Sequence, residues 1–150
     1  MTSIAVDPCI AWSNKFDKPE AGSLLDPLGE TQTPLAEMVR EKFSAIKGIR
    51  EDLGWLGLPW RWTFAYRPRR KGSEPFLYLV PDPERPRVCI RLDADVVCSI
   101  EVEKLSSTAR DALAGATRVG TRVWTEIELT SKTQADDAID LAERAASLAL

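Results

Sequence analysis

Two segments of the chain carry a helical pattern of apolar and polar residues. Pro34 after Thr33 suits the first turn of a helix, and Gly54 suits its end. Ser131 and Gln134 form a capping-box pattern that opens a second helix, which runs to about residue 148. In both segments the apolar side chains share one face at about 100° per residue: Leu35, Met38, Val39, Ile46, Ile49 and Leu53 in the first, and Ala135, Ala138, Ile139, Ala142, Ala145, Ala146 and Ala149 in the second.

A period of two predicts strands between these helices. Every aromatic residue of segment 60–67 falls on one face of a strand. Segment 76–80 is apolar on both faces and is expected to be a central strand, and segments 87–92 and 121–130 alternate. Because the first three of these strands are separated by short turns, we expect an antiparallel meander.

The region between the meander and the last strand is less regular. Residues 94–104 fit either a strand or a helix, and the alternation of their apolar positions favours a strand. Residues 107–114 are predicted to form a short helix that is capped by Ser106 or Ser107.

The order of these elements predicts an α+β fold. We expect a two-layer sandwich, in which an N-terminal and a C-terminal helix pack on a mostly antiparallel sheet of about four to five strands. A length of 150 residues suits one domain. Residues 1–30 contain scattered prolines, glycines and acids without a sustained period. They are predicted to be a partly extended N-terminal extension, followed by a single domain over residues 31–150.

Composition excludes several kinds of function. The chain has no histidine, so Ser-His-Asp and Cys-His nucleophile systems and histidine-ligated zinc sites are excluded. A net charge of −3 argues against a surface built wholly for nucleic acid. No apolar run approaches the length of a membrane span, and the first residues do not have the pattern of a signal peptide. We therefore expect a cytoplasmic protein with no membrane contact and no cofactor.

The cysteines suggest structural roles. Cys9, Cys89 and Cys98 are odd in number and have no CxxC spacing, which favours reduced thiols. Because Cys89 and Cys98 lie among β-branched residues, we expect both to be buried and inert.

Several segments carry a resemblance to a known family: Phe64-Ala65-Tyr66, Phe76-Leu77-Tyr78-Leu79-Val80-Pro81, Val88-Cys89-Ile90-Arg91-Leu92, and Trp124-Thr125-Glu126-Ile127-Glu128-Leu129 before an Asp-rich helix. Over about residues 34–148 the chain resembles small bacterial YdhG/YjbR-like proteins of unknown function. The resemblance implies a two-layer α+β domain with an antiparallel sheet, and it carries no common catalytic motif. Some similar proteins are compared with frataxin-like iron chaperones, which makes carboxylates on a helix worth testing as ligands.

One candidate site combines aromatic and basic residues. Aromatic rings on a sheet can stack on unpaired bases while neighbouring cations hold phosphates. The alternative interpretation is that the same aromatic face is the core beneath the helices and that the basic segment is a solvated turn. The candidate residues are Trp55, Trp60, Trp62, Phe64 and Tyr66 with Arg61, Arg67, Arg69, Arg70 and Lys71.

A second candidate lies on the last predicted helix. Asp136, Asp140 and Glu143 fall within about 60° of one another at helical spacing, and oxygen ligands suit Mg²⁺, Ca²⁺ or weakly held Fe²⁺. The alternative is an ordinary solvated helix face whose first acids complement the helix dipole.

These observations favour a non-enzymatic binding or accessory protein that holds a protein partner or a small ligand through an aromatic-rich surface. This interpretation rests on the presence of five tryptophans in 150 residues, because tryptophan is enriched in the hot spots of binding interfaces. One alternative is a single-stranded nucleic-acid-binding module that uses residues 61–71. Another is a small enzyme that uses carboxylates or Tyr66 as acid or base, or a weak metal (iron) chaperone.

Overall fold

The computed structural model describes residues 18–55 and 62–149. Its elements along the chain are η1 (Ala21–Ser23), α1 (Gln32–Ser44), β1 (Ile49–Trp55), β2 (Trp62–Pro68), β3 (Leu77–Val80), β4 (Arg87–Asp93), α2 (Ala94–Ser99), η2 (Val102–Lys104), α3 (Ser107–Ala114), β5 (Thr117–Val119), β6 (Arg122–Glu128) and α4 (Lys132–Ala149).

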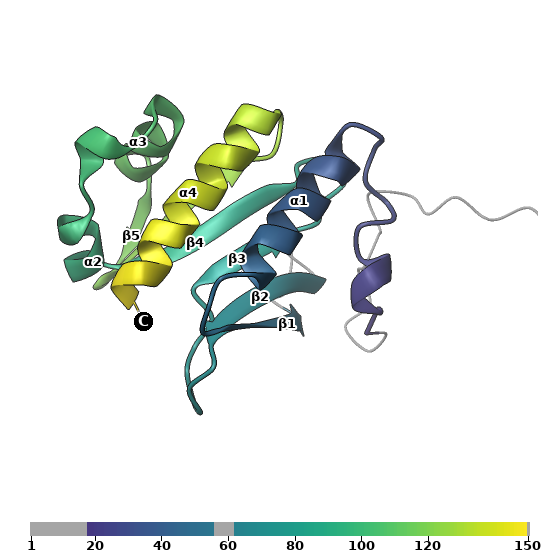
Figure 1. Ribbon diagram of the computed structural model, residues 1–150, viewed down its shortest axis with the longest axis horizontal. Helices are drawn as coiled ribbons and strands as arrows, with labels where there is room; N and C mark the ends of the chain where they lie inside the picture. The colour runs from purple at the N-terminus through teal and green to yellow at the C-terminus, as the bar shows by residue number, and fades with distance from the viewer. Residues whose placement is uncertain (1–17, 56–61, 150) are drawn as a thin grey trace, which may run out of the picture.

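The strands form one antiparallel sheet with the order β1-β2-β3-β4-β6-β5. Helices α1 and α4 lie side by side on one face of this sheet, and α2 and α3 lie beyond α4 near β5 (Figure 1). The predicted α+β class and antiparallel sheet are confirmed, with six strands where four to five were expected.

The first predicted helix is too long, because it ends at Ser44 and residues 49–55 form β1. Ile49 and Leu53 are four residues apart, and this spacing fits one face of a strand as well as one face of a helix. Gly48 decides between the two, since its φ of 85° breaks the helical path and begins the turn into the strand. All seven residues of β1 then pair with β2.

The strand favoured for residues 94–104 is also wrong. This segment forms α2 and η2, whose Val96 and Val97 pack against the main core. The reason lies in the sheet, because β4 already pairs with β3 on one side and with β6 on the other. A strand formed by residues 94–104 could not pair with β4, because both edges of β4 are occupied, and the segment forms a helix instead.

The main core lies between the sheet and the helices. Small residues on α4, among them Ala138 and Ala142, are fully buried and let the helix approach the sheet closely. Leu24 is also fully buried here, so residues 18–30, which sequence analysis placed in an extension, contribute to the core. Six residues of the predicted apolar stripe of α4 are packed in the core as the sequence pattern predicted: Ala135, Ala138, Ile139, Ala142, Ala145 and Ala146. The side chain of Ala149 lies outside what the structure describes.

The opposite face of the sheet carries a second, smaller cluster. It consists of Ala65, Tyr78, Val80 and Cys89, with Trp124 packed against them. Because side chains alternate along each strand, this face also presents the polar residues of β4 and β6 that are described below.

Two predicted helix caps are present. Ser106 Oγ accepts a hydrogen bond from Ala109 N at 3.2 Å, and Ser131 Oγ accepts one from Gln134 N at 3.2 Å. None of the helices within residues 18–55 and 62–149 is long and apolar enough to cross a membrane.

Candidate functional site

The aromatic residues of β2 lie in the main core. Trp62 is 8% exposed, and Phe64 and Tyr66 are fully buried beneath the helices. Trp55 is half-buried and meets Trp62 edge to face, with 6.0 Å between ring centroids and an interplanar angle of 66°. The predicted candidates Trp60 and Arg61 lie outside the described residues. The described part of this aromatic face is therefore core.

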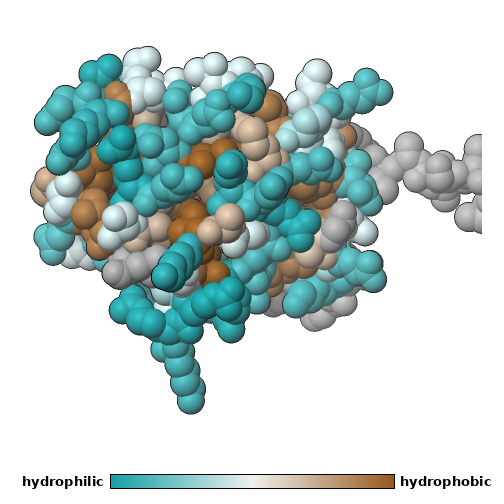
Figure 2. Space-filling model, in the orientation of Figure 1, coloured by the Kyte–Doolittle hydropathy of each residue, from teal (hydrophilic) through white to brown (hydrophobic). Residues whose placement is uncertain are grey.

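The basic candidates lie elsewhere. Arg67 points to the opposite face of the sheet, where its Nε lies 3.1 Å from Asp52 Oδ2. Arg69, Arg70 and Lys71 are exposed on the turn between β2 and β3, which projects from the body as a hydrophilic tip (Figure 2). The structure thus separates these cations from the buried rings of β2, and the two groups do not form one surface.

The candidate metal ligands on α4 do not come together either. Asp136 pairs with Lys132 at 3.7 Å, and Asp140 pairs with Arg144 at 3.0 Å. Glu143 is exposed on the same helix. Within the described part of the chain, no group of three or more suitable side chains is placed to hold a metal ion.

Tyr66, the candidate acid or base, belongs to a bridge between α1 and the sheet. Its hydroxyl donates to Glu51 Oε2 at 2.8 Å, and the same carboxylate receives Arg40 Nη2 at 3.0 Å and Nε at 3.1 Å. Burial, reinforced by the Glu51 charge, raises the pKa of Tyr66 well above its usual value of 10.0. The hydroxyl therefore keeps its proton at neutral pH and acts as a structural donor.

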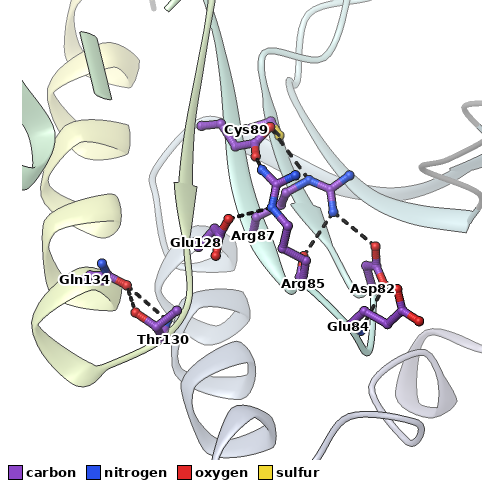
Figure 3. A network of polar contacts seen from close by, with 9 residues as sticks. Asp82, Glu84, Arg85, Arg87, Cys89, Glu128, Thr130 and Gln134 are labelled. Carbon is purple, nitrogen blue, oxygen red and sulfur yellow. Dashed lines mark hydrogen bonds and ion pairs between the residues drawn. The ribbon is translucent and has the colours of Figure 1, made fainter. Parts of the chain in front are cut away.

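A polar network lies at the other end of the sheet, beside the turn between β3 and β4 (Figure 3). Arg87 is almost fully buried, and its Nη1 donates to the Arg85 carbonyl at 3.0 Å and to Asp82 Oδ2 at 3.3 Å. Arg85 forms ion pairs with both Glu126 and Glu128 on β6. These contacts fix the ends of β4 and β6 and offset part of the charge of the two glutamates.

Cys89 adjoins this network. Its Sγ lies 3.9 Å from Glu126 Oε2, and burial raises the pKa of the thiol to about 11. A thiol with this pKa is protonated at neutral pH, so Cys89 is a poor nucleophile. The prediction of a buried, inert thiol is confirmed for Cys89, whereas Cys98 on α2 is exposed and that part of the prediction is wrong.

A cavity of about 400 Å³ opens at the outer edge of β6. It exists because β5 pairs only with Arg122–Trp124, which leaves the outer side of the rest of β6 without a strand partner among the described residues, while the end of α3 lies beside it. We call this the edge cavity; it is lined by Cys89, Asp111, Ala112, Gly115, Thr117, Trp124, Thr125 and Glu126. Its volume lies within the usual range of small-molecule sites.

Two residues give the edge cavity its chemistry. Trp124 lines it, and the Trp124 ring packs on Tyr78, with centroids 5.7 Å apart. Asp111 is exposed on α3, and its carboxylate has no ion pair with any described residue. Thr125 is 1% exposed and pairs with Ile90, so its side chain points to the helix-covered face of the sheet, away from Trp124. An aromatic residue and a carboxylate without an ion pair together suit a ligand that carries an ammonium group.

Sequence reasoning missed Asp111 and Thr117 as site residues, and it named Trp124 only within a segment that carries the family resemblance. The cavity depends on the shortness of β5 and on the position of α3, and no local motif encodes either feature. Comparison of the chain with models of protein families, with curated proteins and with solved structures found no match. The resemblance to YdhG/YjbR-like proteins stays a prediction.

Proposed function

We propose that this protein is a non-enzymatic binding protein that takes a small organic ammonium ion into the edge cavity. The observation that carries the proposal is that Trp124 and Asp111 line the same cavity, and that the Asp111 carboxylate has no ion pair with any described residue. A cation over a tryptophan face gains about 0.5–2 kcal/mol, depending on how far it is desolvated. The carboxylate adds a direct counter-charge.

The acids of the edge cavity differ in how far their charge is balanced. Glu126 contributes less, because Arg85 and Arg87 already balance its charge. Asp111 has no ion pair with any described residue, so it supplies the uncompensated negative charge of the edge cavity.

A binding role also fits the state of the strongest candidate nucleophile and base. Cys89, the thiol of the edge cavity, has a pKa of about 11, and the pKa of Tyr66 is raised well above 10. Both groups hold their protons at neutral pH, where a general base must be deprotonated. With no histidine in the chain, these groups do not assemble an acid–base pair.

The test is an NMR titration of the full chain labelled with ¹⁵N, in which the indole N–H signals report each tryptophan. The Trp124→Phe variant assigns the Trp124 signal. The probes are tetramethylammonium and propylammonium, with propionate as the matched anion. We expect both cations, and not propionate, to shift the Trp124 signal selectively.

Two variants refine this test. Asp111→Asn is expected to weaken the binding of both cations by about tenfold, equivalent to 1.4 kcal/mol, while Asp95→Asn on α2 leaves it unchanged. If Trp124 responds to neither cation at millimolar concentration, or if Asp111→Asn has no effect, the proposed function is wrong.

A further inference from the structure

Two arginines on the sheet face opposite α1 and α4 converge on one carboxylate. Arg91 Nη1 and Arg122 Nη2 each lie 2.7 Å from the same oxygen, Glu74 Oε2. The arginines come from neighbouring strands, β4 and β6, where the paired residues bring their side chains to one face. Glu74 comes from the connection between β2 and β3, which lies 17 residues from Arg91 and 48 from Arg122 in the sequence.

The two sides of this contact differ in how firmly they are held. The Arg91 side chain is 14% exposed and is packed on the sheet, and Arg122 is 44% exposed beside it. The Glu74 side chain is 59% exposed, on the connection between β2 and β3. The cationic half is therefore preorganised, whereas the carboxylate can leave at low cost because exposed ion pairs are weak.

The surroundings of the contact are rich in positive charge. Arg70 lines a small cavity of about 120 Å³ together with Arg91 and Glu74. Arg67 lies on the same sheet face, two strands away from β4 and paired with Asp52, and the exposed turn adds Arg69 and Lys71. The acids in this region are Glu74 and Asp52, with Asp93 at the end of β4. Cations exceed carboxylates here even while Glu74 is in place.

We propose that Arg91 and Arg122 form a binding site for a phosphate group of a ligand, and that Glu74 fills this site while the ligand is absent. Arginine guanidinium groups match phosphate oxygens with two donors each, and a phosphate carries more charge than the carboxylate it replaces. The site requires nothing from the edge cavity, so it stands apart from the proposed function.

The experiment is calorimetric titration of the full chain with pyrophosphate, at low salt, in the wild type and in Glu74→Gln. Removing the internal carboxylate is expected to tighten pyrophosphate binding by roughly threefold to tenfold, the effect of breaking two exposed ion pairs. Adding Arg122→Gln to Glu74→Gln is expected to abolish that gain. The matched control is Arg118→Gln on β5. Arg118 is exposed and pairs with Val123 of β6, so its side chain lies on the opposite face of the sheet from Arg122, and its loss should not change pyrophosphate binding.

A parallel titration with a short thymidine oligonucleotide distinguishes the source of the phosphate. Salt-sensitive binding that tightens in Glu74→Gln would identify a nucleic-acid backbone as the ligand, and pyrophosphate binding alone would identify a small phosphate compound. If Glu74→Gln lowers the melting temperature but leaves affinity for both probes unchanged, Glu74 is only a tether and the proposal is overturned. Asp111→Asn should not affect pyrophosphate, so this proposal and the ammonium site can fail separately.

Discussion

The hydroxyl of Tyr66 offers a direct test of how α1 is fastened to the sheet. It donates to Glu51 at 2.8 Å, and Glu51 also holds Arg40 of α1. Tyr66→Phe removes this donor and keeps the ring, which meets Phe43 edge to face with 5.2 Å between centroids. No cavity opens, so the cost is confined to the hydrogen bond.

The magnitude follows from the charge and exposure of the acceptor. A hydrogen bond to a charged group contributes about 1.5–3 kcal/mol to stability. The Glu51 side chain is 20% exposed, so water can replace the lost donor in part. We therefore expect the lower end, a loss of about 1.5 kcal/mol in the free energy of unfolding. For a domain of this size that is a fall of about 3–6 °C in melting temperature.

Urea unfolding followed by far-ultraviolet circular dichroism measures this loss. Glu51→Gln and the double variant complete a double-mutant cycle, which isolates the coupling between the two side chains. Glu37→Ala, which alters an exposed carboxylate on the same helix, controls for loss of helix-surface charge. A wild-type stability for Tyr66→Phe, or additive effects in the cycle, would refute the bridge as a stabilising contact.

Three further outcomes follow from the structure. Because the folded state raises the pKa of Tyr66, the stability that this shift contributes is complete below pH 10 and declines above it, and alkaline urea titrations should show a smaller decline in Tyr66→Phe. In the native protein, iodoacetamide should label exposed Cys98 much faster than buried Cys89, as mass spectrometry of digested peptides can measure. Gly48→Ala should cost about 1–2 kcal/mol because φ is 85° there, whereas Gly115→Ala, with φ at −90°, should cost much less in the same melts.

The sequence was a good guide where one period dominated. Alternation in the segments of β2, β4 and β6 and the alanine stripe of α4 correspond to elements of the structure, because a buried face leaves little freedom of register. Prediction failed where two apolar residues were four positions apart, as Ile49 and Leu53 are, because this spacing fits one face of a helix and one face of a strand equally well. It also failed for residues 94–104, where the pairing of β4 on both sides, a property of the whole sheet, determined the local structure.

The site was harder to predict than the fold. The sequence showed that aromatic residues share one face of β2, but whether that face is core depends on where the helices pack. Asp111 and Trp124 line the edge cavity from separate elements, and Glu74 meets Arg122 across 48 residues. Such juxtapositions arise from tertiary structure and leave no periodic signal in the chain.

The shortness of β5 has a consequence for self-association. Leu129 N donates to the Pro86 carbonyl. The backbone N–H and C=O groups of the odd-numbered residues at this end of β6 therefore face β4, and those of the even-numbered residues face away from β4, toward the outer edge. An open strand edge of this kind is a template for aggregation between copies of a protein. The residues whose backbone groups face this edge are Glu126 and Glu128. If two copies paired along this edge, the glutamate side chains of one copy would lie next to those of the other, and like charges in such cross-strand positions are destabilising. The glutamates that form ion pairs with Arg85 within the chain thus also oppose aggregation through this strand edge.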